Sequence, residues 1–288
     1  MKPATTAPSV GLSTPQALNQ AVWQICDVLR RAGVGSAIRY VPELTWILFL
    51  RVLDEQEAIE REEADALGLT YEPSLTSPYR WQDWAAPWSD KPGAALADNG
   101  LPLGWKRRQL QEGRRGDFFA FVNGRLLPYL RGLRLRSGAT AKQKVISEII
   151  SPIERIGIDT ESNFADVLDR VHALRLAGTD TQHQFMLSQV YEGLLLKMGE
   201  KNSDGGQFYT PRELIRAMVR VVAPRIGQTV CDPCCGTGGF LAESAEYMRA
   251  RGGELTAEAL DTLRHRSFYG REKDNLAYPI ALANLVLH

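Results

Sequence analysis

The sequence predicts an α + α/β fold, in which an all-helical N-terminal domain is followed by the first part of a parallel sheet. Two observations predict it. Up to residue 199 every segment has the pattern of a helix or a loop. Beyond residue 206, helical segments alternate with short strand-like ones, which is typical of a parallel sheet covered by helices. We expect a flexible tail over 1–14, a helical domain over 15–199 and an α/β part over 200–288.

Composition sets broad limits on the class of protein. The chain has 288 residues, 44% of them hydrophobic and 24% charged, which suits one or two globular domains. The net charge of zero does not point to a nucleic-acid partner, although a balanced total can hide a local basic patch. We find no apolar run of the ~20 residues that a membrane span needs and no signal core near the N-terminus, so we expect a cytoplasmic protein.

Cysteine usage argues against a disulfide framework or a metal centre. The four cysteines are Cys26, Cys231, Cys234 and Cys235, and no second cluster of His or Cys completes a metal site with them. We therefore predict no bound metal. The thiols are expected to be small buried side chains in a reducing compartment.

The helical domain is read from apolar spacing and from helix-start signals. Thr14-Pro15 marks the first helix start, and a second apolar helix is expected from about Pro42 up to the charged stretch 54–63. Three later helices follow from apolar residues at helical spacing. These residues are Val145, Ile146, Ile149, Ile150 and Ile153; Phe164, Val167, Leu168, Val171 and Leu174; and Phe185, Val190, Leu194 and Met198.

Two segments of this domain allow more than one interpretation. Residues 70–105 combine five prolines with four tryptophans, which favours a loop pinned by its indoles over a base-stacking surface. Residues 106–136 are rich in arginine. They could contact phosphates, form a solvated helix face or meet an acidic partner.

The α/β part begins after a polar boundary at 200–206. We expect helices over 212–222, 239–251 and 275–287, and strands over 228–232 and 268–272. The buried first strand ends in Asp232, and the glycines of Gly236-Thr-Gly-Gly239 allow a ligand close to the backbone. This turn fits neither the dinucleotide nor the phosphate-loop pattern, and a purely structural tight turn is the alternative.

Two more features flank this turn. Thr210-Pro-Arg-Glu213 reads as a capping box with proline in the first turn, and Phe208 and Tyr209 precede it. A helix N-terminus can bind a carboxylate, and the aromatic pair could cover an adenine or a methionine chain. Glu272 ends the second strand, where a carboxylate can accept hydrogen bonds from both ribose hydroxyls, or can simply begin a helix.

These motifs closely resemble the modification subunits of type I restriction-modification systems. The resemblance is carried by Gln207-Phe-Tyr-Thr-Pro-Arg212, Asp232-Pro-Cys-Cys-Gly-Thr-Gly-Gly-Phe240 and Phe268-Tyr-Gly-Arg-Glu272, in that order. The segments 23–30 and 48–54 are similar to the helical domain of the same family, so that the resemblance spans about residues 15–288. It implies a Rossmann-like methyltransferase sheet and a site-specific DNA adenine-N6 methyltransferase that uses S-adenosylmethionine.

The resemblance also implies a role for each site residue. Gln207, Phe208, Tyr209, Thr210, Pro211 and Arg212 would line the methionine end of the cofactor. Gly236, Thr237, Gly238 and Gly239 would form the turn beneath it, Asp232 would stand near its ammonium group, and Glu272 would hold the ribose. The implied partners are DNA, a specificity subunit, a restriction subunit and a second modification subunit.

The family's catalytic element, Asn/Asp-Pro-Pro-Tyr/Phe, does not occur after the glycine turn. We therefore expect a truncated chain that is inactive alone, because nothing would hold the extruded adenine, and assign no catalytic residue. We also expect an exposed edge on the strand that ends at Asp232. Two alternatives stay open: a non-catalytic subunit that only docks on partners, and a methyltransferase acting on RNA or protein. The sequence does not predict the DNA target.

Overall fold

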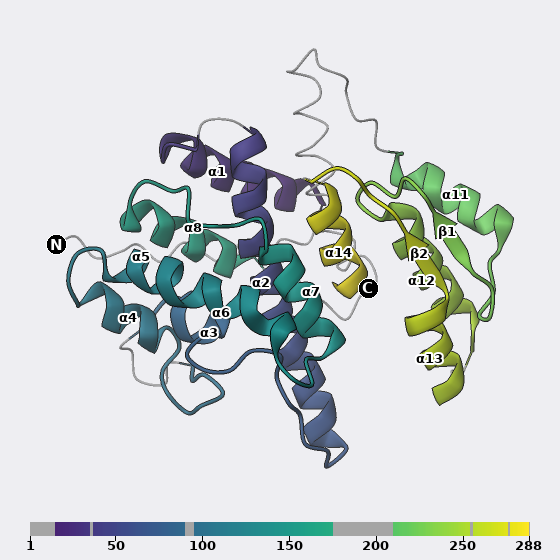
Figure 1. Cartoon of the computed structure of the whole chain (residues 1–288), viewed down its shortest axis with the longest axis horizontal. Coiled ribbons are helices and arrows are strands. Elements are labelled where there is room, and N and C mark those ends of the chain that lie inside the picture. The colour runs from purple at the N-terminus through teal and green to yellow at the C-terminus, as the bar shows by residue number, and fades with distance from the viewer. Residues whose placement is uncertain are drawn as a thin grey trace.

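The computed structural model describes residues 15–34, 37–89, 95–174, 210–253, 256–275 and 277–287. Within them a helical body is joined to a small α/β unit, which confirms the predicted fold class (Figure 1). The expected tail over 1–14, the helix over 185–198 and the boundary at 200–206 lie outside the described residues. The domain limits therefore stay a prediction.

The helical body is built from short and long helices in sequence order. Its elements are α1 (Pro15–Arg31), α2 (Ala37–Ala66), α3 (Trp81–Trp84), α4 (Trp105–Gln111), α5 (Asp117–Phe121), the π-helical η1 (Val122–Leu126), α6 (Leu127–Gly132), the 3-10 turn η2 (Leu133–Leu135), α7 (Ala141–Ile150) and α8 (Glu161–Ala173). Helix α2 is the central element, because it packs against α1, α3 and α8 and many of its side chains are buried.

Helix α2 is longer than predicted. It begins before Pro42, which lies inside it, and it continues through the charged stretch to Ala66. Partners outside the helix hold this extension. Glu57 accepts a hydrogen bond from the backbone N–H of Ser74 at 2.9 Å, and Glu60 accepts one from the Tyr71 hydroxyl at 2.7 Å. The charges therefore bind the following segment to the helix rather than ending it.

The tryptophan-rich segment packs as the favoured interpretation expects. Trp81 and Trp84 are buried, and the ring of Trp84 stacks on Trp46 of α2 with centroids 6.3 Å apart. The buried carboxylate of Asp83 accepts a hydrogen bond of 2.7 Å from Nε1 of Trp105, and burial raises its pKa. Indoles buried in the core cannot stack on bases, so the structure favours a pinned loop.

The α/β unit contains α11 (Arg212–Val222), β1 (Val230–Asp232), α12 (Gly239–Arg251), α13 (Ala257–Arg266), β2 (Phe268–Gly270) and α14 (Ala277–Leu287). The two strands pair in parallel, with Val230 opposite Phe268 and Asp232 opposite Gly270. Both are shorter than predicted, and α13 was not predicted. The expectation of a buried first strand is wrong, since Cys231 is exposed and its neighbours in β1 are only half-buried.

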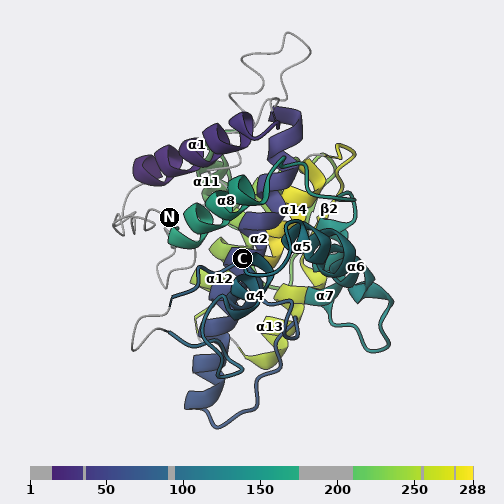
Figure 2. The same ribbon diagram turned by 90° about the vertical axis from the view of Figure 1, so that its left-hand side faces the viewer.

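Helix α14 belongs to both parts of the molecule. Its Ile280 and Ala283 are fully buried in the same apolar core as α2 and α7. It also packs against α12 of the α/β unit. Figures 1 and 2 both place it beside α2 and α7. The helical body and the small sheet are thus connected by a shared, strongly apolar helix.

Candidate cofactor-binding site

The carboxyl ends of the two strands bring the predicted residues together. Asp232 ends β1 as expected, whereas Glu272 lies two residues beyond the end of β2. The chain continues the pairing past the strands, because the N–H of Arg271 donates to the carbonyl of Asp232 at 3.0 Å. Glu272 then reaches the glycine turn, where its Oε2 accepts a hydrogen bond of 2.8 Å from the N–H of Gly236.

The turn between β1 and α12 requires glycine at two positions. Gly236 has φ of 54° and Gly238 has φ of 79°, in the left-handed region that side chains disfavour. The N–H of Gly238 donates to the carbonyl of Cys235 at 2.7 Å, which closes the turn. The N–H of Cys235 donates to the carbonyl of Arg271 at 3.0 Å, so the turn is also tied to the segment after β2.

The Glu272 carboxylate is held by three backbone donors. Besides Gly236, the N–H groups of Lys273 and Asp274 donate to its Oε1, each at 2.7 Å. An ionised carboxylate has about four acceptor positions. One position at Oε2 is therefore left for a ligand hydroxyl. Binding of both ribose hydroxyls, as predicted, needs one of these backbone bonds to be exchanged for a ligand bond.

One oxygen of the Asp232 carboxylate is held by the turn. This oxygen, Oδ1, accepts a hydrogen bond of 3.2 Å from the N–H of Cys234, which keeps the side chain in place. Among the described residues nothing donates to Oδ2. The half-buried carboxylate thus has the chemistry that a ligand ammonium group needs.

Asn284 on α14, which is not among the predicted site residues, supports the turn. Thr237 is buried, and its carbonyl accepts a hydrogen bond of 2.7 Å from Nδ2 of Asn284 on α14. Asn284 is only 1% exposed. The signal in the sequence was a single amide within the otherwise apolar run 277–287. Such a buried amide is retained where it has a specific partner, and here that partner is the turn.

Gly239 and Arg212 serve the packing of α11 on α12. A Cβ on Gly239 would lie 2.9 Å from Cδ1 of Ile215, and the Gly239 carbonyl accepts from Nη1 of Arg212 at 3.3 Å. Arg212 is buried at this contact rather than open to a ligand. The close contact between α11 and α12 therefore explains by itself why residue 239 has no side chain.

The predicted capping box at Thr210 is wrong. Helix α11 begins at Arg212, its N-cap is Pro211, and no side chain caps it. Pro211 fills the cap position with extended backbone, so the threonine lies one residue too far from the first turn. Thr210 is half-buried and Pro211 is exposed. Gln207, Phe208 and Tyr209 lie outside the described residues.

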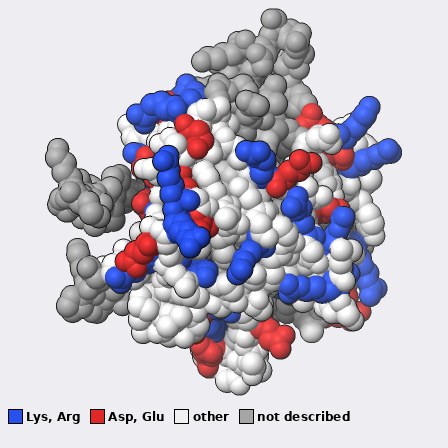
Figure 3. Space-filling model, turned by 60° about the vertical axis from the view of Figure 1, so that its left-hand side comes forward, with Lys and Arg blue, Asp and Glu red and all other residues white. Residues whose placement is uncertain are grey.

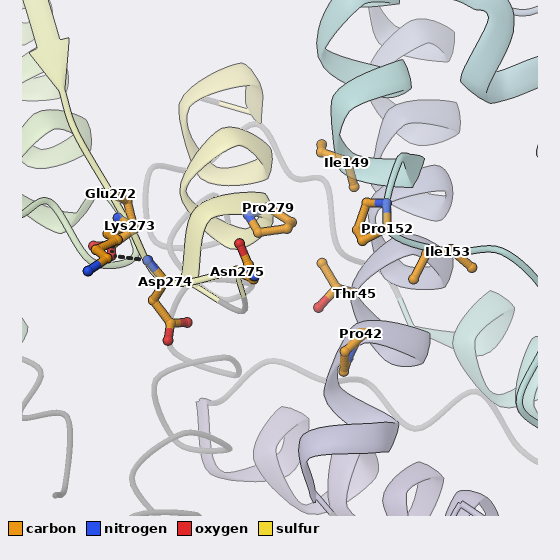
Figure 4. Close-up of a pocket in the computed structure, with 10 residues that line it drawn as sticks. All are labelled: Pro42, Thr45, Ile149, Pro152, Ile153, Glu272, Lys273, Asp274, Asn275 and Pro279. Carbon is orange, nitrogen blue, oxygen red and sulfur yellow. Dashed lines mark hydrogen bonds between the residues drawn. The ribbon is translucent and has the colours of Figure 1, made fainter.

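A cleft of about 770 Å³ separates Glu272 from the helical body (Figure 4). In Figure 4 the segment after β2 forms one wall and the ends of α2 and α7 form the other. Among the predicted cofactor residues described here, only Glu272 borders this space. The lining residues are Pro42, Thr45, Ile149, Pro152, Ile153, Glu272, Lys273, Asp274, Asn275 and Pro279. The volume is in the range of ligand pockets.

The cysteines near the turn differ from the prediction of buried thiols. Cys26 is buried, and burial raises its pKa to about 12. Cys231 in β1 and Cys234 in the turn are exposed. The described residues contain no group of three or more metal-ligating side chains. In the same part of the chain no helix is long and apolar enough to cross a membrane.

The structure divides the arginine-rich segment 106–136 into two groups. Arg107 is buried, pairs with Asp169 at 2.6 Å and donates to two backbone carbonyls, so it supports the core. Others have partners as well: Arg108 stacks on Trp88 with its guanidinium 3.7 Å from the ring centroid. Exposed guanidinium groups without a side-chain partner among the described residues are those of Arg114, Arg115 and Arg125.

Comparisons with known proteins give matches to both parts of this architecture. A family model described as N-6 DNA Methylase matches residues 182–288, and one described as HsdM N-terminal domain matches residues 18–102. The chain is 27% identical to the type I restriction enzyme EcoEI methylase subunit of Escherichia coli, over 94% of this chain and 49% of that protein. It is 29% identical to the StySJI methylase subunit of Salmonella typhimurium, over 93% and 42%.

Solved structures agree. A modification subunit assigned to a type I restriction enzyme of Vibrio vulnificus YJ016 superposes with a TM-score of 0.73 at 29% identity, covering 97% of this chain and 55% of that one. A chain from a structure of a type I restriction-modification assembly gives 0.63 at 35% identity, over 96% and 49%.

Residues 182–288 therefore resemble an N-6 DNA Methylase domain, and residues 18–102 resemble an HsdM N-terminal domain. Over nearly its whole length the chain is similar to methylase subunits of type I restriction enzymes. It spans about half the length of the curated relatives that it matches.

Proposed function

We propose that this chain supplies the S-adenosylmethionine-binding part of a site-specific DNA adenine-N6 methyltransferase subunit in a type I restriction-modification system. The observation that carries the proposal is the convergence of Asp232, the glycine turn and Glu272 at the carboxyl ends of two parallel strands. Ligands of open α/β folds bind outside this edge of the sheet. The match of residues 182–288 to the N-6 DNA Methylase family supports S-adenosylmethionine as this ligand.

Each residue has a role that its surroundings support. The Asp232 carboxylate receives the ammonium group through Oδ2, and Glu272 accepts a ribose hydroxyl at Oε2. The turn from Gly236 to Gly239 keeps side chains away from the cofactor. By the resemblance of their sequence motif alone, we assign Gln207, Phe208, Tyr209, Thr210 and Pro211 to the methionine end. Bound S-adenosylmethionine supplies the methyl group, and the chain's own residues orient it.

The chain alone should bind the cofactor without methylating DNA. The sequence has no Asn/Asp-Pro-Pro-Tyr/Phe after the glycine turn, and the resemblance assigns the binding of an extruded adenine to that element. The proposal places the subunit in the cytoplasm with DNA, a specificity subunit, a restriction subunit and a second modification subunit. Methyl transfer from labelled cofactor to DNA by the chain alone would contradict the expectation that the chain binds the cofactor without methylating DNA.

Cofactor binding by isothermal titration calorimetry tests the proposal directly. The 288-residue chain should bind S-adenosylmethionine, and Asp232→Asn or Glu272→Gln should weaken binding about tenfold or more, because each removes a charge-assisted hydrogen bond. Glu258→Gln is the matched control, since Glu258 is exposed on α13. Absence of binding at millimolar cofactor, or equal affinity in all four proteins, would refute the assignment of the site.

DNA contact is the second part of the proposal, and it depends on Arg114, Arg115 and Arg125. Figure 3 shows Lys and Arg scattered over one face with Asp and Glu among them. For DNA binding, the arginines without an acidic partner therefore matter more than the total charge of this face. In the complex with the specificity subunit, Arg114→Glu with Arg115→Glu should weaken DNA binding and lower the salt dependence by about two counterions. Arg264→Glu, on exposed α13, should change neither; unchanged binding in the double variant would exclude this contact.

A further inference from the structure

The cleft of about 770 Å³ between the α/β unit and the helical body has two unlike walls. The wall on the helical body is apolar, and it is formed by Pro42 of α2, by Ile149 in the last turn of α7, and by Pro152 and Ile153, which follow α7. The isoleucines are buried, so the partly exposed rings of Pro42 and Pro152 form most of the surface that a ligand would meet. Apolar walls of this kind are typical of ligand pockets, in which a few polar groups complete the lining.

The opposite wall is polar and comes from the segment that follows β2. Its charged groups are the carboxylates of Glu272 and Asp274 and the ammonium group of Lys273. Two negative charges against one positive charge give this wall a negative balance, which repels phosphate groups. The cleft therefore fits a ligand group that is uncharged or positive, and it disfavours a nucleotide phosphate or the DNA backbone.

Asn275 adds a neutral recognition group to the polar wall. Figure 4 shows it between the segment that carries Glu272 and the helical body. Its side chain is exposed, and within the described part of the chain its amide forms no hydrogen bond. An amide offers a donor and an acceptor side by side, the pattern that is complementary to the polar edge of adenine. A flat ring with apolar faces and a polar edge matches both walls.

Glu272 decides which part of the cofactor enters this cleft. It borders the space, whereas Asp232 and the glycine turn do not line it. In the proposed function Asp232 receives the ammonium group and Glu272 accepts a ribose hydroxyl. The methionine chain and the base are attached to the ribose on opposite sides of its ring oxygen. The group that extends past Glu272, away from Asp232, is therefore the adenine ring.

We propose that the helical body forms one wall of the cofactor site, so that the cleft holds the adenine ring of S-adenosylmethionine between Pro42 and Pro152 on one side and Asn275 on the other. This inference rests on the proposed function and extends the site to a part of the chain in which the sequence predicts no cofactor contact. S-adenosylmethionine carries a sulfonium group and no phosphate, in keeping with the negative balance of the polar wall. Cofactor binding then fastens the α/β unit to the helical body across the cleft.

Photolabelling locates the ring. The 288-residue chain is irradiated with S-adenosylmethionine that carries a photoreactive azido group on its adenine, and the labelled peptides are identified by mass spectrometry. Label should appear in the helical body, in peptides that contain residues 42–45 or 149–153. Excess S-adenosylmethionine should suppress this label, whereas ATP at the same concentration should not, because its phosphates are repelled. Labelling confined to the α/β unit, or equal suppression by ATP, overturns the proposal.

Matched variants test each wall by isothermal titration calorimetry. Pro152→Gly removes an apolar ring from the cleft and should weaken S-adenosylmethionine binding about fivefold. Ser151→Gly, at the exposed neighbouring residue that does not line the cleft, loosens the same turn and should bind as the parent does. Equal affinity in these two variants contradicts a contact with the helical body.

Asn275→Ala tests recognition of the base. The parent should bind S-adenosylhomocysteine more tightly than S-inosylhomocysteine, in which a carbonyl replaces the amino group of adenine. In Asn275→Ala this preference should fall about two- to tenfold, because a hydrogen bond to the ring edge is lost. Asp232→Asn should weaken both ligands and keep the preference. An unchanged preference in Asn275→Ala, with weakened binding in Asp232→Asn, overturns the inference and leaves the proposed function intact, whereas no binding by the parent at millimolar ligand overturns both.

Discussion

Acidification should destabilise the fold through His172, a half-buried histidine on α8. Nε1 of Trp81 donates a hydrogen bond of 3.1 Å to its Nδ1, so the neutral ring is the form that accepts this bond. Burial, with the nearby guanidinium groups of Arg51 and Arg107, lowers the pKa of His172 to about 4. A proton on Nδ1 would remove the acceptor and place a third positive charge beside the two arginines.

The sign and size of the effect follow from this lowered pKa. The unfolded chain takes up the proton near the ordinary value of 6.5, before the folded chain does. The stabilisation is therefore fully present above that pH and is lost as the pH falls toward 4. From this residue alone the free energy of unfolding falls by about 2 kcal/mol between pH 7 and pH 5. Asp54 acts oppositely, because burial raises its pKa from 3.8 to about 7. Its contribution to the free energy of unfolding is present at low pH and is lost as the pH rises toward 7.

Urea unfolding of the chain between pH 5 and pH 8 measures this effect. His172→Gln keeps an oxygen acceptor for Trp81 but does not titrate, so the stability lost between pH 7 and pH 5 should shrink by about 2 kcal/mol relative to the parent. His265→Gln is the control, since the side chain of His265 is 61% exposed on α13. Equal pH dependence in the parent and in His172→Gln would refute the reasoning.

Three further substitutions test the packing around the site and the core. Asn284→Ala leaves the buried Thr237 carbonyl without its donor and should cost about 1–3 kcal/mol by urea unfolding. Gly270→Ala puts a Cβ 2.7 Å from a leucine methyl of α12 and should cost about 1–3 kcal/mol, whereas Gly132→Ala, with open space around it, should not destabilise. Arg107→Ala should lower the melting temperature by several degrees, because the carbonyls of Ala85 and Ala165 and the carboxylate of Asp169 lose a partner. A melting temperature equal to that of the parent would show that this arginine is not part of the core.

Strong local signals made parts of the fold predictable. The glycine turn and the helical spacing after it predicted α12 over Gly239–Arg251, the bounds that the structure has. The spacing of apolar residues likewise predicted α11. Helix α13 was missed because only Leu263 is buried among its residues, so it carries almost no apolar period. The sequence marks this helix by its Thr256 cap and by its place between α12 and β2, and each is a weak signal alone.

The proximity of two predicted site residues could be foreseen, whereas the detail of their contacts could not. Brändén's rule brought Asp232 and Glu272 to one edge, and the structure places them there. The three backbone donors on Glu272 could not be foreseen, because one of them comes from a turn 36 residues earlier in the chain. Burial of Arg212 and exposure of Cys231 also depend on which neighbours lie beside them. Sequence spacing does not contain that information.

Helix α14 has a mechanical consequence for the glycine turn. One side of it is embedded in the core of the helical body through Ile280 and Ala283, while Asn284 holds the backbone of the glycine turn. Any rotation of the helical body must therefore either carry the turn along or break a buried hydrogen bond. A movement of the helical body would therefore be transmitted to Thr237, at the glycine turn of the proposed cofactor site. If both proposed ligands bind, α14 would couple the affinity for the cofactor to the affinity for a partner, without contact between the two ligands.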